Sequence, residues 1–462
     1  MLGFSRGLPA TEPGCRPNFL FILVDDMGWA DLNCYGSTFY ETPNVDRIAA
    51  GGVRFTSGYA ACPVCSPTRA SIMTGKYPAR IGLTNWLSGR IKKRLVGAPY
   101  IKQMPLEEVT IAEALKEAGY VTGFVGKWHL GGKPFYPEKQ GFDVNVAGCH
   151  AGSPMGGYFA PWNNPKLRAG RKGEYLTDVL TDAGVAFIES NKDRLFFLYQ
   201  SYHTVHTPIQ AKPGYVEKYR AKAAGLLPHR GPEFLPEGCT HTRQVQRHPV
   251  YAGMMQSMDE NVGRLLDALD RLSLADNTVV VFMSDNGGLA TTAAPTSNLP
   301  LRAGKGWLYE GGIREPFIIR WPGVTRPGSV CHEPVTSTDF YPTMLEMAGL
   351  PPKPAQHRDG VSLVPLLKEA TSLDREALYW HYPHYSPQGG CPSSAVRQGD
   401  YKLIEFFEDG HVELYNLARD IGEKHDLVEK LPEKTKQLHA MLKTWRRQVG
   451  AKLPAPNPDY SR

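Results

Sequence analysis

Short apolar runs recur along the first three quarters of the chain, and helix-like stretches separate them. The run at residues 19–24 is continuously hydrophobic, as expected for a strand buried on both faces of a sheet. Similar runs predict further strands at residues 120–125, 195–199, 278–283 and 317–319. Strands that alternate with helices in this way predict an α/β fold with a largely parallel sheet.

Two of the intervening segments have the periodicity of amphipathic helices. Residues 111–118 place apolar side chains on one face, with Thr110 as the N-cap and Gly119 as the stop signal. The longer segment 251–272 has an apolar face that begins with Met254 and Met258. We expect these methionines to fill the core rather than to bind a metal.

The pattern changes from about residue 351. A proline-rich stretch is followed by two alternating runs that Glu-Asp-Gly separates, which predicts an antiparallel hairpin with its turn near Asp409 and Gly410. A last helix is predicted over residues 432–449. The chain therefore divides into a large α/β domain, 15–350, and a small α+β subdomain, 351–462, with an antiparallel sheet and a terminal helix.

Composition restricts the function without identifying it. The 462 residues are 42% hydrophobic and 21% charged, which is ordinary for a soluble globular protein. The net charge of +6 suits an anionic substrate but is too weak to indicate nucleic-acid binding. No apolar run approaches the roughly 20 residues of a membrane span. Residues 1–16 lack the apolar segment of a signal peptide, so the compartment stays open: cytoplasm if this N-terminus is native, periplasm or secretion if a leader was removed.

Polar residues directly follow the four strongest strand candidates. In open parallel sheets, ligands bind beyond the carboxyl ends of the strands, so these residues are expected at one edge. The pairs Asp25–Asp26 and Asp285–Asn286 offer only oxygen ligands, which suits Ca²⁺ or Mg²⁺. The sequence Asp-Asn-Gly is, however, also typical of a turn without any bound metal. The four sets are Asp25 and Asp26; Lys127 and His129; His203 and His206; and Asp285 and Asn286.

A Cys-x-x-Cys pair, Cys62 and Cys65, suggests a redox dithiol or half of a zinc site. The helix that follows argues against both. With Ser66 as N-cap and Pro67 as first residue, Cys65 stands at the helix start, whereas reactive dithiols place their first cysteine there. The other six cysteines are solitary, so they complete no second ligand pair for zinc and form no disulfide scaffold.

The segment Cys65-Ser66-Pro67-Thr68-Arg69, continuing as ASIMTGKYP, resembles the signature of the type I sulfatases in the alkaline-phosphatase-like superfamily. The resemblance extends over nearly the whole chain, through PNFLFILVDDMGWADLNCYG, GKWHLG, SDNGG and GKGWLYEGGIREPFIIRWPG. It implies a large mixed, mostly parallel sheet between helices, with a small C-terminal antiparallel sheet.

The resemblance also implies two cofactors. A maturase would oxidise Cys65 to Cα-formylglycine, an aldehyde that hydrates to a diol with a nucleophilic hydroxyl. One Ca²⁺ would be bound by residue 65 and by four residues that match the family ligands: Asp25, Asp26, Asp285 and Asn286. A metal-dependent phosphatase of the superfamily often has histidine at the last position.

The remaining matches imply roles in the reaction. Arg69 would hold the formylglycine, and Lys127 and His129 would lie beside it. Lys305 would bind the sulfate, and His206 would protonate the leaving group. His203 lies near the last of these in the sequence, and its role stays open.

The main hypothesis is a hydrolase that cleaves a sulfate monoester, on a sulfated polysaccharide or glycosaminoglycan. Phosphate or phosphonate ester hydrolysis, a broad arylsulfatase and an inactive protein that binds sulfated glycans are the alternatives. We expect loops 84–95, 147–162 and 379–390 to line the rim. Candidate substrate contacts are His150, His203, Arg302 and His384.

Overall fold

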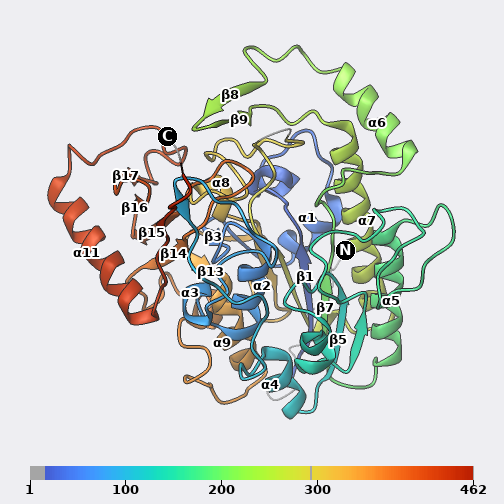
Figure 1. Cartoon of the computed structure of the whole chain (residues 1–462). Coiled ribbons are helices and arrows are strands. Elements are labelled where there is room, and N and C mark those ends of the chain that lie inside the picture. Colours follow the sequence, from blue (N-terminus) through green and yellow to red (C-terminus); the bar gives the residue numbers. More distant parts are fainter. Residues whose placement is uncertain (1–15, 292–293, 461–462) are drawn as a thin grey trace, which may run out of the picture.

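The apolar runs form the centre of one large sheet in the computed structural model of the chain, which describes residues 16–291 and 294–460 (Figure 1). The expectations about a leader segment and Cys15 fall outside these residues. All five predicted strands are present, and they join three shorter strands in a mixed, mostly parallel sheet. In spatial order these are β12 (Ser329–Cys331), β2 (Val53–Phe55), β11 (Phe317–Arg320), β10 (Thr278–Ser284), β1 (Asn18–Val24), β7 (Phe196–Ser201), β5 (Val121–Gly126) and β6 (Val144–Val146).

Helices cover both faces of this sheet, as the uninterrupted apolar strands require. Leu20, Ile22 and Val24 of β1 enter the hydrophobic cluster under α7 (Pro249–Arg271) and α5 (Leu176–Ser190). Phe19 and Phe21 face the opposite cluster, under α2 (Cys65–Thr74), α4 (Ile111–Glu117) and α9 (Phe340–Met347). The described part of the chain contains no helix long and apolar enough to cross a membrane.

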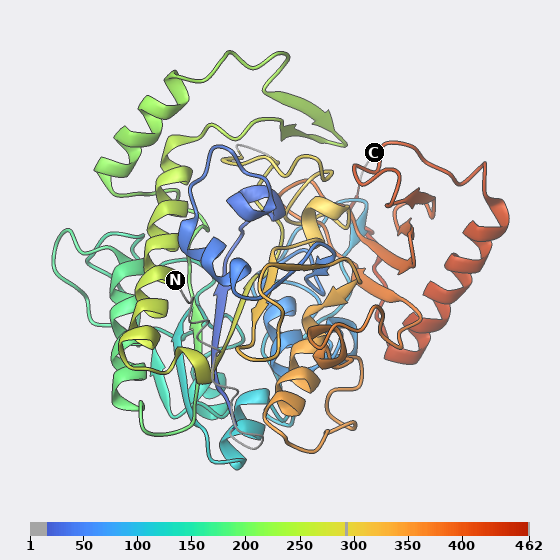
Figure 2. The ribbon, with the colours of Figure 1, turned by 180° about the vertical axis from the view of Figure 1, so that it is seen from behind.

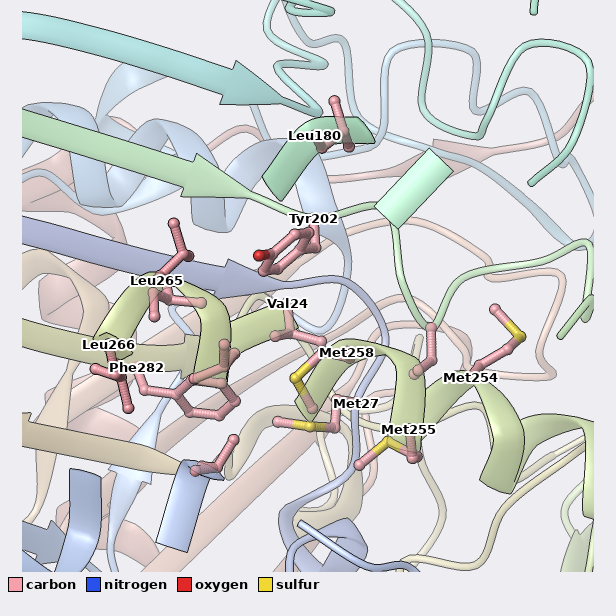
Figure 3. Close-up of a cluster of buried hydrophobic side chains, with 14 of the residues drawn as sticks. Val24, Met27, Leu180, Tyr202, Met254, Met255, Met258, Leu265, Leu266 and Phe282 are labelled. Atoms are coloured by element: carbon pink, nitrogen blue, oxygen red, sulfur yellow. The ribbon is translucent and has the colours of Figure 1, made fainter. Parts of the chain in front are cut away.

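The methionines of α7 belong to the core, as predicted. Met254, Met255 and Met258 are fully buried in the cluster that also contains Val24 and Phe282, and Met258 lies beside Val24 at the end of β1 (Figure 3). Flexible thioethers fill the irregular space between a helix and strand ends well. The sulfur atoms therefore have a packing role.

The C-terminal sheet contains four strands, two more than the two predicted runs suggest. The run 395–406 turns at Gly399 and Asp400 into two strands, because Gly399 has a positive φ of 56°. The hairpin with its turn near Asp409 and Gly410 is confirmed. The sheet has the order β14 (Leu378–Tyr382), β15 (Ser393–Gln398), β16 (Tyr401–Phe406) and β17 (Val412–Asn416), and α11 (Pro432–Val449) covers it (Figure 2).

An arm formed by α6 (Pro213–Ala224) and the hairpin β8 (Phe234–Glu237) and β9 (Thr240–Arg243) extends over the top of the molecule in Figure 1. No sequence pattern predicts it, since the hairpin is mostly exposed and has no buried face to impose a register. The remaining α-helices and strands of the described residues are α1 (Pro43–Ala50), α3 (Pro78–Ile81), α8 (Glu310–Ile313), α10 (Val364–Leu367), β3 (Gly58–Tyr59), β4 (Leu95–Val96), β13 (Val335–Thr336) and β18 (Ala455–Pro456).

A buried ion cluster joins the C-terminal sheet to the large sheet's loops. Lys402 Nζ on β16 lies 2.9 Å from a carboxylate oxygen of both Glu310 and Glu423, and all three side chains are fully buried. Tyr59 OH donates to Glu310 at 2.7 Å. Because α8 follows the loop that carries Lys305, this cluster also fixes one wall of the site described below.

We expect Lys402→Met to lower the free energy of unfolding by about 3–5 kcal/mol, because, among the described residues, Glu423 would remain buried without a cation and Glu310 would keep only its ion pair with Arg314 at 3.1 Å. Denaturant unfolding measures this. The matched control is Lys436→Met, which breaks the exposed Lys436–Glu433 pair and should cost less than about 1 kcal/mol. Equal losses in the two variants would contradict a special role for the buried cluster.

Candidate functional site

Strand register brings the predicted polar residues together. Val24 pairs with Ser284, so Asp25 and Asp285 leave adjacent parallel strands at the same level, and the Asp285 amide donates to the Val24 carbonyl at 3.0 Å. On the other side, Gly126 pairs with Ser201. The sets that follow β1, β5, β7 and β10 therefore meet at one edge of the sheet.

Arg69 of α2 binds the Asp285 carboxylate at this edge of the sheet. Its Nε donates to Asp285 Oδ2 at 2.8 Å, and its terminal nitrogens contact the same oxygen, the Lys127 carbonyl and Ser201 Oγ. The guanidinium is 2% exposed. Sequence reasoning missed Ser201, which ends β7 and whose serine side chain alone gives no motif signal.

Two lysines pair with the aspartates that follow β1. Lys127 Nζ lies 2.5 Å from Asp25 Oδ2, and Lys305 Nζ lies 2.7 Å from both oxygens of Asp26. With Arg69 and Asp285, the buried site contains three cations and three carboxylates.

Burial decides the direction of the pKa shift for two of these three carboxyls. It raises the pKa of Asp25 despite Lys127, and together with Asp25 it raises that of Asp285 to about 6. Burial would also raise the pKa of Asp26, but Lys305 and then His206 hold it below the usual range. Additional positive charge at this position would therefore stabilise the ionised carboxylates.

The donor set fits a hard cation. Asp25 Oδ1 and Asn286 Oδ1 are buried oxygens without a hydrogen-bond partner among the described residues, and such atoms usually have one. One ligand atom each from Asp25, Cys65 and Asp285 lie within 4.8 Å of one another. Carboxylate and amide oxygens of this kind are typical ligands of Ca²⁺ and Mg²⁺.

Cys65 is the first residue of α2, which corrects the predicted helix start. Val64, with φ −142° and ψ 156°, is the N-cap, and Ser66 does not cap because its buried hydroxyl has no hydrogen-bond partner among the described residues. Pro67 is tolerated in this first turn. The predicted end is correct, since Gly75 adopts the left-handed conformation with φ 67°.

The Cys65 side chain faces His129, with 3.3 Å between Sγ and Nδ1. Burial raises the pKa of Cys65 even though Lys127 opposes it, and burial also raises that of Cys62. A reactive dithiol requires a cysteine with a lowered pKa, so the burial of both thiols does not favour a redox dithiol here. Cys62 belongs to an apolar cluster with Tyr59.

His129 is held in a constrained position. Its φ is 54°, and a Cβ added to Gly152 would lie 2.4 Å from its Cε1 atom, so glycine is required there. Burial, followed by the charge of Lys127, holds the pKa of His129 well below its usual range. The neutral ring is able to accept a proton from its neighbour.

The two other predicted histidines, His206 and His203, differ in their position: His206 lines the cavity, whereas His203 is buried and does not. His206 Nδ1 lies 2.7 Å from the Thr207 carbonyl, to which it donates, and Nε2 lies 3.7 Å from Asp26 Oδ2. Burial lowers the pKa of His206 to about 3, although Asp26 opposes this. His203 is buried, its carbonyl accepts the His206 backbone N–H at 2.9 Å, and burial holds its pKa well below the usual range too.

A cavity of about 310 Å³ opens above this group, and all three predicted rim loops contribute to it. Sequence reasoning identified the loops but not which side chains line them. The lining residues are Asp26, Val64, Cys65, Trp86, Ser88, His129, Gly152, Ser153, His206, Thr207, Leu289, Lys305, Pro387 and Gln388.

The candidate substrate contacts lie elsewhere. Within the described residues, the cavity lining includes none of His150, His203, Arg302 and His384. Arg302 instead forms an ion pair with Glu237 of the arm at 2.8 Å, and His384 lies 2.8 Å from Thr84 Oγ1 beneath the rim. These pairings join distant segments, so no local pattern could have predicted them.

Comparison with known proteins gives consistent matches. The Sulfatase family matches residues 17–350, and the family described as N-sulphoglucosamine sulphohydrolase, C-terminal, matches residues 303–449. Human arylsulfatase A is 33% identical over 93% of this chain and 86% of its own length. Human N-acetylgalactosamine-6-sulfatase is 35% identical over 81% of this chain and 70% of its own length.

A solved structure also matches this chain over nearly its whole length. The crystal structure of Ps i-CgsB in complex with k-i-k-neocarrahexaose superposes with a TM-score of 0.77, at 29% identity, over 93% of both chains. Since the family match covers well over half of the chain, this protein belongs to the sulfatase family of the alkaline-phosphatase-like superfamily and is a sulfuric ester hydrolase.

Proposed function

We propose that the protein hydrolyses a sulfate monoester of a carbohydrate, with Cys65 converted to formylglycine and one Ca²⁺ bound beside it. The observation that carries the proposal is the position of the Cys65 side chain: it begins α2, faces His129, and lines the cavity together with Asp26 and Lys305, within 4.8 Å of ligand oxygens of the buried Asp25 and Asp285. Asp25, Asp26, Asp285, Asn286 and residue 65 would hold the ion.

The two cofactors would supply a Lewis acid and a hydroxyl nucleophile on residue 65. The protein's own cations complete the electrostatics. Lys305 lines the cavity, and Lys127 lies beneath it, so a sulfate bound over Cys65 would have its oxygens near both ammonium groups. In a buried site such charges stabilise a sulfuryl group far better than in water.

Two histidines are placed to move protons. His129 Nδ1, 3.3 Å from the side chain of residue 65, would accept a proton from a hydroxyl there. His206 donates its Nδ1 proton to the Thr207 carbonyl, so Nε2 would carry the proton given to the departing ester oxygen. Its pKa is low in the resting site, and an arriving anionic substrate would raise it.

Two observations support a carbohydrate as the substrate: the side chains that line the cavity wall, and the substrates or ligands in the names of the matched proteins. Trp86 offers an aromatic face, and Ser88, Ser153, Thr207 and Gln388 offer hydroxyl and amide groups. This combination suits a sugar ring with one apolar face and several hydroxyls. Two of the matched proteins point to sugars by name or ligand: one is named N-acetylgalactosamine-6-sulfatase, and the other was solved in complex with k-i-k-neocarrahexaose.

The test of the reaction class is a comparison of nitrophenyl sulfate with nitrophenyl phosphate. We expect a higher kcat/KM for the sulfate, because Asn286 provides no imidazole for a second, phosphatase-type metal. Product analysis on defined sulfated monosaccharides then tests the sugar. Faster phosphate cleavage would favour the phosphate or phosphonate alternative, and turnover of aryl sulfates alone would favour a broad arylsulfatase.

We expect His206→Ala to lower kcat on a sugar sulfate by about 10²–10⁴-fold, because an alkoxide needs a proton as it departs. Nitrophenolate leaves without one, so the loss on nitrophenyl sulfate should be far smaller. Steady-state rates on both substrates measure the difference. Exposed His332 is the control, and His332→Ala should change neither rate. Equal losses on the two substrates would contradict the leaving-group role.

A further inference from the structure

One surface loop concentrates positive charge that the modest net charge of +6 does not reveal. Arg90, Lys92, Lys93 and Arg94 are all exposed, and together we call them the basic loop. Within the described residues, none of the four forms an ion pair with a carboxylate. Other exposed lysines do have such partners, as Lys218 has in Glu41.

The backbone of the basic loop is fastened at both ends. Tyr100 OH donates to the carbonyls of Trp86 and Gly89 at 3.0 and 3.1 Å. Asn457 donates to the carbonyls of Lys93 and Arg94, next to the pairing of β4 with β18. The loop therefore holds four like charges close together, an arrangement that repulsion disfavours unless an anion compensates it.

The loop is continuous with the cavity rim. Trp86 and Ser88, just before it, line the cavity. Lys93 Nζ lies 5.4 Å from the ring centroid of Tyr385, two residues before the lining residue Pro387, and 3.9 Å from Cys239 at the tip of the β8–β9 hairpin. The hairpin tip and the C-terminal end lie side by side in both ribbon views (Figures 1 and 2).

The cavity itself has room for little more than one sugar. Its volume of about 310 Å³ is at the lower limit of typical ligand pockets. The lining residues with ionisable side chains are the site residues Asp26, Cys65, His129, His206 and Lys305 at its floor, and the rest of the described lining is uncharged. Anionic groups on neighbouring sugars of a polymer would therefore lie outside, at the rim.

We infer that the substrate is a polyanionic glycan whose flanking sugars bind the basic loop through their anionic groups. This inference rests on the proposed function and names the substrate class of the same site. The attraction acts over about 8–10 Å, which reaches beyond the rim and weakens as salt is added. Sulfate and carboxylate groups share the chemistry, and the experiment separates them.

The experiment measures inhibition of nitrophenyl sulfate turnover by dextran sulfate, by polygalacturonate and by neutral dextran. The variant is Arg90→Ser, Lys92→Ser, Lys93→Ser and Arg94→Ser combined. The matched control removes four exposed cations from and next to α11: Lys430→Ser, Lys436→Ser, Lys443→Ser and Arg447→Ser combined. Calorimetric titration of the Cys65→Ala protein with the same polymers, with and without the loop substitutions, provides a readout that needs no turnover.

We expect dextran sulfate to inhibit the wild type, and its inhibition constant to rise at least tenfold, as an order of magnitude, in the loop variant, because each exposed ion pair contributes roughly two- to fivefold. The α11 variant should change it less than about twofold, and both variants should keep kcat/KM on nitrophenyl sulfate. Inhibition by polygalacturonate as well would extend the site to carboxylates.

Equal weakening in both variants would mean that only net charge matters, and it would overturn the inference. So would a wild type that neither polyanion inhibits or binds. If neither nitrophenyl sulfate nor any of the sulfated monosaccharides is turned over, the proposed function fails, and the calorimetric titration alone decides whether the basic loop binds polyanions.

Discussion

Cys65→Ala is expected to abolish sulfate ester hydrolysis, with kcat at least about 10⁴-fold lower, because removal of a nucleophile leaves only binding and electrostatic effects. Alanine retains the buried helix start but carries no group that can be oxidised to an aldehyde. Initial rates on nitrophenyl sulfate, with the protein folded by circular dichroism, measure the loss.

The matched control is Cys62→Ala, three residues earlier. Both thiols are buried, at 1% and 3% exposure, but Cys62 packs among apolar side chains and not beside His129. We expect a stability loss of about 1 kcal/mol and turnover within about twofold of the wild type. Equal loss of turnover in the two variants would revive the dithiol interpretation.

Mass spectrometry of the peptide that contains Cys65 tests the modification directly. Conversion to formylglycine exchanges the sulfur and two hydrogens for one oxygen. We expect active protein to contain the lighter peptide and the unconverted thiol form to be nearly inactive. Full activity in protein that is entirely in the thiol form would rule the proposed conversion out.

The centre of the fold could be predicted from the sequence because its strands are buried on both faces. Continuous apolar runs then give the position of each strand, and the polar residue after each run gives the edge of the sheet. Adjacent strands in register place Asp25 beside Asp285 without any further information. Strand pairing thus explains why a one-dimensional pattern indicated a three-dimensional site.

The short outer strands and the side-chain positions of the rim loops could not be predicted, because these segments contain no long apolar run and their positions depend on contacts with distant segments. β2 is three residues long, and it enters the sheet between β11 and β12 from a distant part of the sequence. The rim depends on loops whose side chains are positioned by tertiary contacts, such as the Tyr100 hydroxyl that holds the Trp86 carbonyl. Arg302 illustrates the limit: it is a candidate substrate contact in the sequence analysis, but its guanidinium forms an ion pair with Glu237 of the arm.

Removal of divalent cations is expected to lower turnover at least about 100-fold, because the proposed Ca²⁺ would no longer be present to act as a Lewis acid. Without the ion, burial favours protonation of Asp25 and Asp285, so the site also loses the ionised oxygens that would bind it. Dialysis against a chelator, followed by addition of Ca²⁺, tests this. The midpoint of thermal unfolding should fall and recover with the activity, since a bound ion stabilises only the folded state.

Asn286→Ala makes the prediction specific to the proposed ligands. It removes the amide oxygen that has no hydrogen-bond partner among the described residues, so the Ca²⁺ concentration for half-maximal activity should rise about 10–100-fold. The control is Asp31→Asn, because Asp31 is equally buried but its carboxylate is already bonded to Tyr251, Thr296 and the Gly28 amide. Its Ca²⁺ response should match that of the wild type. Elemental analysis accompanies each titration, and unchanged activity in protein shown to be metal-free would remove the ion from the mechanism.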